Sequence, residues 1–198
     1  MAIDQIHDLQ QVYRKLLHSM ARPGTISSIQ PQTAKVEYHI PCNRATLLSA
    51  MALLDAETTF YVLPQQASGF IERISEYTSA RCAPIKEADF IIVLGECSEE
   101  EILQAMAHCK IGNLLDPQLS ATWIIESKDL SESGELLLSG PGIQSAAPLG
   151  IGMPATFWQA RNNRVKEYPL GIDLIFADDD SRIACLPRTT SVIALEVE

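Results

Sequence analysis

The sequence lacks the local motifs that carry the commonest kinds of catalysis and phosphate binding. Its 198 residues contain no G-x-x-x-x-G-K-[ST] phosphate loop and no G-x-S-x-G nucleophile elbow. The four histidines show neither H-x-x-x-H nor H-E-x-x-H spacing, so no metal site is expected. The chain therefore offers no self-contained catalytic constellation, and its catalytic residues, if it has any, stay unknown at this stage.

Basic runs and long apolar runs are also missing. The formal net charge is −10, and no cluster of Lys or Arg occurs, which argues against direct binding of nucleic acid. No stretch approaches the roughly 18 consecutive apolar residues of a membrane span. The first residues carry Asp4 and Asp8 and have no apolar core like that of a signal peptide. We therefore expect a cytoplasmic protein without a membrane partner.

Disulfide frameworks are equally poorly supported. The number of cysteines is odd, their spacings are long, and no C-x-x-C occurs. This pattern is typical of reduced thiols in a cytoplasmic protein, several of them buried as small apolar side chains. The five residues concerned are Cys42, Cys82, Cys97, Cys109 and Cys185.

What is present is a regular alternation of helix and strand signals. Helices are predicted over 4–20, from Asn43, over 67–79, from Ser98 with Gly112 as its stop, and over 154–164. Asp4 is expected to cap the first helix, and Ser98-x-x-Glu101 forms a capping box. Apolar residues of the first helix recur at three- and four-residue steps, as expected of a buried side: Ile6, Leu9, Tyr13, Leu16, Leu17 and Met20.

The strand signals concentrate in the middle and in the last third. Strands are predicted over 58–63, 90–94, 121–126, 135–138, 172–176, 183–186 and 192–197, with a short strand near 26–29. The run 90–94 (FIIVL) is continuously apolar, as in a central strand that is covered on both faces. We predict an α/β fold with three layers, in which helices cover both faces of one mixed sheet. No linker divides the chain, so residues 1–198 are expected to form one domain.

Three features imitate functional motifs and have commoner structural explanations. Gly150–Ala155 matches G-x-G-x-x-A, but the residues before it, 145–148, make a poor strand, which disfavours a dinucleotide site. Lys128 follows a predicted strand, where a Schiff-base lysine could sit, although a solvated lysine beside Asp129 is commoner. The acidic run 178–180 is more typical of a turn between two strands than of a Mg²⁺ site.

Four turn-forming segments remain. Each joins regular elements and offers backbone N–H groups, a hydroxyl or a charged group at its turn. Taken alone, each is more often a structural turn than a binding site. They are Arg22-Pro23-Gly24-Thr25, Leu138-Ser139-Gly140-Pro141-Gly142-Ile143, Pro169-Leu170-Gly171-Ile172-Asp173 and Leu186-Pro187-Arg188-Thr189-Thr190.

In this order, the four segments resemble those of the PhnH family, a subunit of the bacterial carbon–phosphorus lyase system. The resemblance covers nearly the whole chain, because it also includes Met20-Ala21, Ala50-Met51-Ala52-Leu53-Leu54-Asp55 and Ser120-Ala121-Thr122. It implies a fold similar to that of pyridoxal-phosphate-dependent transferases, without the cofactor. It also implies pairing as a homodimer and assembly with other subunits of the system.

The activity that this resemblance implies belongs to the assembly. With its partners, the family supports replacement of the adenine of ATP by an alkylphosphonate such as methylphosphonate, which gives α-D-ribose 1-methylphosphonate 5-triphosphate. Two alternatives stay open: a module that binds the nucleotide or phosphonate within that assembly, and an independent nucleotide-binding enzyme based on Gly150–Ala155. The candidate ligand or interface residues are Arg22, Gly24, Ser139, Gly140, Gly142, Asp173, Arg188 and Thr189.

Overall fold

The computed structural model describes residues 3–37 and 41–195. Its larger sheet has the strand order β1-β9-β8-β5-β4-β2-β3. Strands β3, β2, β4, β5 and β8 are parallel, whereas β9 and then β1 continue the sheet in antiparallel pairings. The strand bounds are β1 Ile26–Ser28, β2 Thr59–Leu63, β3 Arg81–Cys82, β4 Phe90–Val93, β5 Thr122–Glu126, β8 Asp173–Ala177 and β9 Arg182–Leu186.

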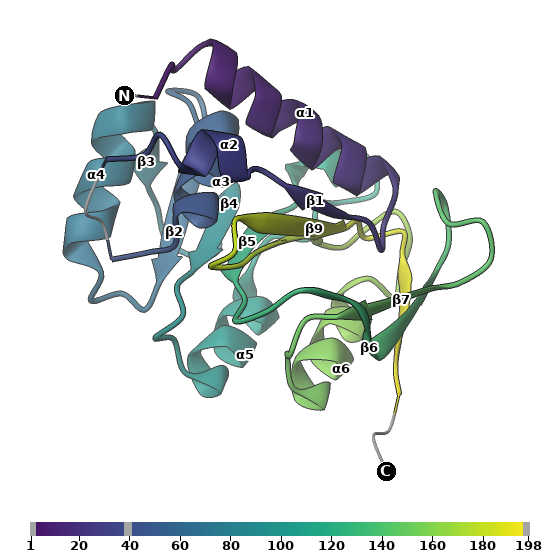
Figure 1. Ribbon diagram of the computed structural model, residues 1–198. Coiled ribbons are helices and arrows are strands. Elements are labelled where there is room, and N and C mark those ends of the chain that lie inside the picture. The colour runs from purple at the N-terminus through teal and green to yellow at the C-terminus, as the bar shows by residue number, and fades with distance from the viewer. Residues whose placement is uncertain (1–2, 38–40, 196–198) are drawn as a thin grey trace.

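Helices cover both faces of this sheet (Figure 1). Four lie on one side: α1 (His7–Ala21), α2 (Gln30–Thr33), α3 (Arg44–Leu53) and α4 (Ser68–Thr78). Two lie on the other: α5 (Glu99–His108) and α6 (Ala155–Arg164). The central strands are apolar throughout because alternate residues enter opposite cores, as Ile91 and Val93 do on one side and Ile92 on the other. The predicted α/β class, with a mixed sheet, is confirmed.

The prediction of one sheet was wrong, because the last third of the chain builds a second. Its antiparallel strands follow the order β10-β6-β7, with bounds Ser191–Ala194, Ser131–Ser139 and Ala147–Gly150. Leu136, Leu138 and Leu149 are buried with the side chains of α6, while Glu135, Leu137 and Ser139, which alternate with them on β6, are partly exposed. A strand that buries only one face does not fit a sheet covered on both faces. Part of the strand predicted over 192–197 lies outside the described residues.

Strand β7 contradicts the prediction of poor strand structure before Gly150. Pro148 disfavoured the prediction of a strand here, because proline cannot donate a hydrogen bond to a sheet ladder. The strand lies at the edge of its sheet, where a proline is tolerated.

Most helix bounds were predicted to within one residue, but α1 begins at His7, with Ile6 and not Asp4 at its N-cap. The Oδ1 atom of Asp4 accepts the N–H groups of Ile6 and His7, at 2.8 and 2.9 Å. The capping box of Ser98 and Glu101 is present in full. However, α5 ends at His108, so Gly112 is not its stop. Gly112 takes a φ of +78° in the next loop, where a Cβ would lie 2.6 Å from the carbonyl oxygen of Pro117.

The apolar residues of α1 do not share one buried side. Val12 and Leu16 are buried against the sheet, whereas Ile6, Tyr13 and Leu17 are exposed. Apolar residues occupy more of the circumference of α1 than one sheet face can cover. Within the described residues, no helix is both long and apolar enough to span a bilayer.

Candidate functional site

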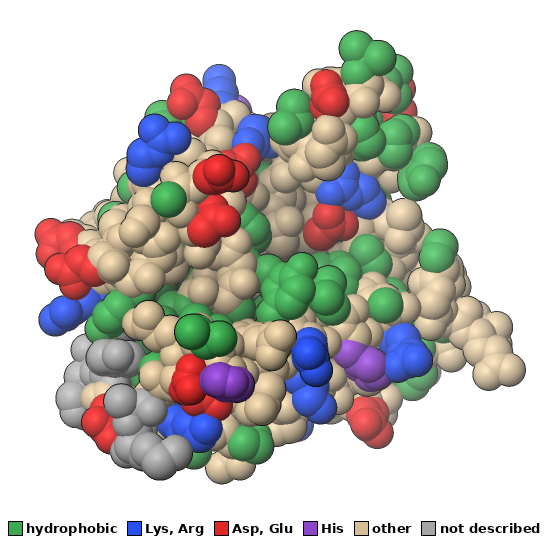
Figure 2. All heavy atoms as spheres, turned by 90° about the horizontal axis from the view of Figure 1, so that it is seen from above, with side chains coloured by type: hydrophobic (Ala, Val, Ile, Leu, Met, Phe, Trp, Pro, Cys, Tyr) green, Lys and Arg blue, Asp and Glu red, His purple; other side chains and the backbone are tan. Residues whose placement is uncertain are grey.

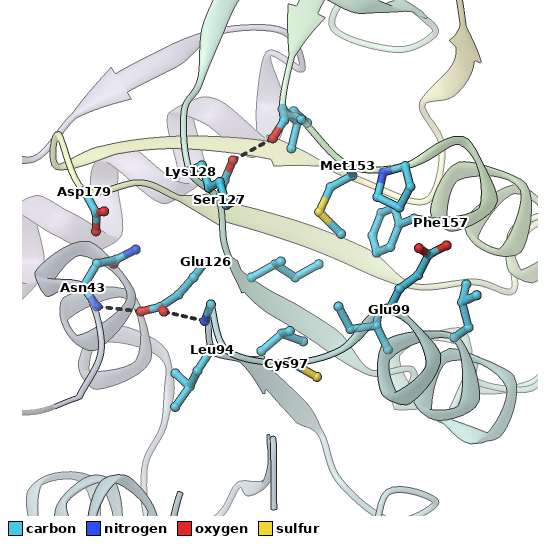
Figure 3. Close-up of a pocket in the computed structure, with 18 residues that line it drawn as sticks. Asn43, Leu94, Cys97, Glu99, Glu126, Ser127, Lys128, Met153, Phe157 and Asp179 are labelled. Atoms are coloured by element: carbon cyan, nitrogen blue, oxygen red, sulfur yellow. Dashed lines mark hydrogen bonds between the residues drawn. The ribbon is translucent and has the colours of Figure 1, made fainter.

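A cleft of about 460 Å³ opens at the carboxyl ends of β4 and β5 (Figure 3). Ligands of open α/β sheets bind in crevices at this edge, outside the carboxyl ends of the parallel strands. One wall comes from the start of α5, and the opposite wall comes from the loop before α6, which carries Met153. Its apolar lining consists of Val93, Leu94, Ile102, Leu103, Ile125, Ile151, Met153, Pro154 and Phe157.

Glu126, the last residue of β5, lies in the middle of this cleft. Its Oε1 accepts the N–H of Asn43 at 2.6 Å, and its Oε2 accepts the N–H of Gly95 at 2.8 Å (Figure 3). The carboxylate thus ties the start of α3 to the loop that follows β4. Burial raises the pKa of Glu126 above its ordinary value, although both N–H groups oppose that rise.

The charges around the cleft are mostly negative. Glu99, Glu126 and Asp179 face a single cationic side chain, Lys128, among the described residues that line it. Lys128 is exposed at its edge, and Asp129 pairs with Arg182 and not with Lys128. A phosphate or phosphonate would meet repulsion here. The cleft instead suits an uncharged or cationic ligand that brings an apolar body and hydrogen-bond donors.

A second hollow of about 520 Å³ adjoins the first, over the ends of β2 and β4. After β2, the chain adds β3 on one side of it and then crosses back to add β4 and β5 on the other side. The order of the strands therefore changes direction between β2 and β4. Such a switch point is the usual ligand position in this fold class. The two hollows share Asn43, Leu94, Gly95, Glu126 and Asp179, so they form one branched cleft.

The dinucleotide-like segment Gly150–Ala155 has its backbone N–H groups already filled. The Oε1 atom of Glu135, on β6, accepts from Ile151 at 3.0 Å and from Gly152 at 2.8 Å. A protein carboxylate therefore stands where a pyrophosphate would lie. The strand before the segment exists, but it belongs to the antiparallel sheet and not to a parallel β-α-β unit. The geometry favours the structural interpretation of this segment.

The four turn-forming segments come together in space. A Cβ on Gly24 would lie 2.7 Å from the Cβ of Ala147, beside Leu138, and a Cβ on Gly142 would lie 2.3 Å from the carbonyl oxygen of Ala21. A Cβ on Gly140 would lie 2.9 Å from the carbonyl oxygen of Thr189. A Cβ on Gly171 would lie 3.0 Å from the Cβ of Arg188. These glycines allow backbones to touch, and so they hold the second sheet to the first.

Arg188 and Asp173 form an ion pair inside this cluster. The Oδ1 of Asp173 accepts the backbone N–H of Arg188 at 2.7 Å, and its Oδ2 pairs with the guanidinium. The Nη1 of Arg188 donates to the carbonyl oxygen of Pro117 at 2.7 Å, and Nη2 also contacts the hydroxyl of Ser120. Every side-chain nitrogen of Arg188 already has a partner in the chain, which favours a structural clamp over an anion-binding group.

The other candidate residues lie around this clamp. Ser139 ends β6, opposite Ser191 of β10, and Thr189 is exposed in the turn next to Arg188. Arg22 is exposed just after α1, where its guanidinium contacts His18. None of the candidate residues lines the branched cleft, so the motif cluster and the cleft are separate features.

Sequence inspection missed Arg161, which supports the same turn from the opposite side. This fully buried residue of α6 donates from Nη1 to the carbonyl oxygen of Thr190 at 2.8 Å and from Nη2 to that of Pro187 at 2.9 Å. Burial lowers the pKa of Arg161 to about 10. No signal in one sequence distinguishes it from a solvated arginine on a helix.

The acidic run forms the turn that was predicted. Asp178, Asp180 and Asp129 lie close enough to hold a cation, but the guanidinium of Arg182 stands among all three. Asp178 is buried and accepts from the backbone N–H and from Nε of Arg182, both at 2.8 Å. The run therefore closes the hairpin between β8 and β9.

Comparison with known proteins places the chain in a family. The family model described as "Bacterial phosphonate metabolism protein (PhnH)" matches residues 2–193. The chain belongs to the PhnH family. It is 29% identical over 185 residues to the "Putative C-P lyase subunit protein HtxG" of Stutzerimonas stutzeri, covering 92% of this chain and 85% of that protein. It is 27% identical over 194 residues to the "Alpha-D-ribose 1-methylphosphonate 5-triphosphate synthase subunit PhnH" of Rhizobium meliloti strain 1021, covering 96% and 92%.

Membership of the PhnH family accords with the motif cluster. The segments by which the sequence resembles the family are those that join the two sheets. Their contacts within the chain support a structural role.

Proposed function

We propose that the chain is a subunit of the carbon–phosphorus lyase core complex. With its partner subunits, it would be required to form α-D-ribose 1-methylphosphonate 5-triphosphate from ATP and methylphosphonate during phosphonate catabolism. The observation that carries the proposal is the match to the PhnH family over residues 2–193. The name of the Rhizobium meliloti relative, which is matched over 96% of this chain, gives the product, and the resemblance to the PhnH family implies the two reactants.

The proposal includes no turnover by the isolated chain. Among the residues that line the branched cleft, the reactive side chains are engaged or poorly suited to attack. Glu126 accepts two backbone N–H groups, and the Ser127 hydroxyl donates to the carbonyl oxygen of Ile151 at 2.8 Å. The pKa of Cys97 is raised to about 12, mainly by burial and then by Glu101, so its thiol is protonated at neutral pH. The remaining catalytic groups would come from other subunits.

The negative charge of the cleft favours binding of the uncharged base over binding of the phosphate or phosphonate groups. Displacement of the base by methylphosphonate releases adenine, the reactant fragment that carries no negative charge. Adenine has a flat apolar ring and an amino donor, which fit the apolar walls and the carboxylates of the cleft. We therefore propose that the cleft binds the adenine base of ATP. Calorimetric titration of the assembled complex with adenine and with methylphosphonate tests this, and binding of methylphosphonate that Lys128→Ala abolishes would contradict it.

Binding of ATP or a phosphonate at Arg22, Ser139, Gly142, Arg188 and Thr189 stays a prediction. The contacts made by Arg188 and Gly142 within the chain give it no support. Homodimer formation by the isolated chain, a cytoplasmic location, the absence of a cofactor, a single domain over residues 1–198 and a fold similar to pyridoxal-phosphate-dependent transferases also stay predictions from the sequence. Light scattering of the purified chain measures the first of these directly.

Growth tests the proposed function in the cell. A strain that lacks its own gene for this subunit is supplied with the chain or with an empty vector, and methylphosphonate is the only phosphorus source. We expect growth only with the chain, and equal growth of both strains on phosphate. Growth on methylphosphonate with the empty vector would refute the proposal.

A further inference from the structure

The hydrogen-bond donors around Glu126 are largely engaged within the chain. Its two oxygens accept the N–H groups of Asn43 and Gly95, which approach the carboxylate from opposite sides (Figure 3). The side-chain amide of Asn43 donates to a backbone carbonyl oxygen at 3.1 Å, and the Ser127 hydroxyl donates to another at 2.8 Å. The centre of the cleft is therefore rich in acceptors and poor in free donors.

The negative charge around Glu126 is a local feature. On the face of the molecule seen in Figure 2, Lys and Arg side chains lie among Asp and Glu side chains. The cleft differs, because Lys128 is the single cation among the described residues that line either hollow, and it is exposed at the edge. Asp179, in the turn between β8 and β9, lines both hollows and adds to the effect of burial in raising the pKa of Glu126. These surroundings favour the neutral form of Glu126.

The other titratable groups of the cleft do not change this balance. Burial, first of all, raises the pKa of Cys42 and of Cys97 to about 12, so both thiols are neutral at neutral pH. The described residues that line the cleft from the loop before α6 and from the start of α4 are not titratable. Two further carboxylates line the hollows, from the loop after β4 and from the start of α5: Glu96 and Glu99.

Adenine presents a donor and an acceptor side by side. Its amino group donates, while the ring nitrogens on either side of that group accept, so the amides of Asn and Gln pair with adenine through two hydrogen bonds. An ionised carboxylate only accepts, and it would leave the ring nitrogen facing a negative oxygen. A protonated carboxyl has one donor and one acceptor, as an amide has. Because the nearby donors are engaged, a protonated Glu126 is the group that can meet both needs of the base.

We propose that Glu126 takes up a proton when the cleft binds adenine, donates a hydrogen bond to a ring nitrogen and accepts one from the amino group. The proton comes from solvent, and no covalent bond of the base changes in this step. The carboxyl oxygens can keep their backbone N–H groups, because an oxygen accepts more than one hydrogen bond. Glu126 is thereby the residue that determines which base is bound. The inference rests on the proposed function, which assigns the adenine base of ATP to this cleft.

The proton on Glu126 also distinguishes adenine from guanine. Guanine has two adjacent donors, the ring N1–H and the exocyclic amino group, and so it pairs with an ionised carboxylate. Adenine should therefore bind with uptake of a proton, whereas guanine should bind without it. The cleft is selective for adenine in the form that holds the proton.

Calorimetry of the assembled complex tests the proposal. The chain is purified with the other subunits, which we call sister subunits, and the complex is titrated with adenosine or with guanosine between pH 5 and 8. Each titration is repeated in two buffers that differ in their heat of ionisation, which measures the protons taken up on binding.

Two variants of the complex are compared with the unchanged complex. Glu126→Gln replaces the protonated carboxyl by an amide, which has the same pair of donor and acceptor. Glu99→Gln is the matched control, because it removes one negative charge at the start of α5, where the carboxylate contacts the hydroxyl of Thr156. Thermal melting shows whether each variant is folded.

We expect the unchanged complex to take up as much as one proton per adenosine. Its affinity for adenosine should fall as the pH rises, by at most about tenfold per pH unit. Guanosine should cause no uptake. Glu126→Gln should bind adenosine with no uptake and no dependence on pH, although one backbone N–H loses its acceptor and the melting temperature falls. Glu99→Gln should behave like the unchanged complex.

The possible failures are distinguishable. Binding of adenosine without proton uptake, or uptake that persists in Glu126→Gln, overturns the inference and leaves the assignment of the base to the cleft in place. Tighter binding of guanosine than of adenosine at pH 5 also overturns it. If the complex binds neither nucleoside, the assignment of the base to the cleft fails together with the inference, whereas membership of the complex is tested separately by growth on methylphosphonate.

Discussion

Asp173 holds Arg188 at two places, the backbone N–H and the guanidinium. Both side chains are largely buried, at 20% and 15% exposure respectively. From this anchored position, the guanidinium reaches the carbonyl oxygen of Pro117 and the hydroxyl of Ser120. The pair therefore joins the start of β8, the turn after β9 and the loop before β5 in one contact.

Arg188→Ala should lower the stability of the isolated chain. The change leaves the Asp173 carboxylate with only a backbone N–H, and stranding a buried partner usually costs about 3–5 kcal/mol. Because the pair is partly exposed, we expect about 2–3 kcal/mol, measured by urea unfolding. Arg73→Ala is the matched control, since its pair with Glu76 is exposed at 57% and 63% and its loss should cost under about 0.5 kcal/mol. Equal stability of Arg188→Ala and the unchanged chain would contradict the structural clamp, and loss of function in the complex at that unchanged stability would favour a ligand-binding role.

Gly142→Ala should destabilise the junction between the two sheets. Its φ is +84°, and the added Cβ would lie 2.3 Å from the carbonyl oxygen of Ala21. We expect a loss above about 2 kcal/mol, from the clash together with backbone strain. Gly152→Ala, with a φ of +73° and open space around it, should cost only about 1 kcal/mol. If both changes cost the same in thermal melts, the close approach of the two backbones is not what requires glycine here.

The five free thiols should react at very different rates. Cys82 is exposed, whereas Cys109 and Cys185 are buried. Burial, assisted by Glu126, raises the pKa of Cys42 to about 12. A colorimetric thiol reagent at neutral pH should therefore modify Cys82 first, and Cys82→Ser should remove this fast phase. A fast phase that persists in Cys82→Ser, or all five thiols reacting together in the native protein, would contradict the burial of Cys109 and Cys185.

The raised pKa of Glu126 predicts a pH dependence of stability. Between the ordinary value of 4.5 and its raised native value, the folded chain binds more protons than the unfolded chain at this site. The contribution of Glu126 is therefore most favourable at low pH, and it is lost as the pH rises through the native pKa, by at most about 1.4 kcal/mol per pH unit. Urea unfolding between pH 4 and 8 should show this loss, and Glu126→Gln should remove it. A difference between the two proteins that is independent of pH, or that grows in favour of the unchanged chain as the pH rises, would refute the assigned shift.

Local signals predicted the elements whose causes are local. The helix start at Asn43 and the capping box of Ser98 and Glu101 formed as expected, because each joins side chains and N–H groups within one turn. The continuous apolar run of β4 predicted a central strand, and the structure confirms that both of its faces are covered. The turn at 178–180 also formed where the acidic run indicated it.

What the sequence did not predict depends on contacts between distant segments. The second sheet, with its proline-containing edge strand β7, forms because distant segments of the chain cover only one face of its strands. The branched cleft is built by loops that meet only in the fold, and Glu126 looked like the end of an ordinary strand. The four motif segments were recognised, but their meaning changed: they join two sheets, with the buried Arg161 as an unforeseen support.

Reconstitution of the reaction tests the central claim most directly. The sister subunits are purified with and without this chain, then supplied with ATP and methylphosphonate, and the ribose 1-methylphosphonate 5-triphosphate formed is measured. We predict product only when the chain and its sister subunits are all present, and none from the chain alone. Equal product formation without the chain would contradict its place in the complex, and turnover by the isolated chain would contradict its dependence on partners.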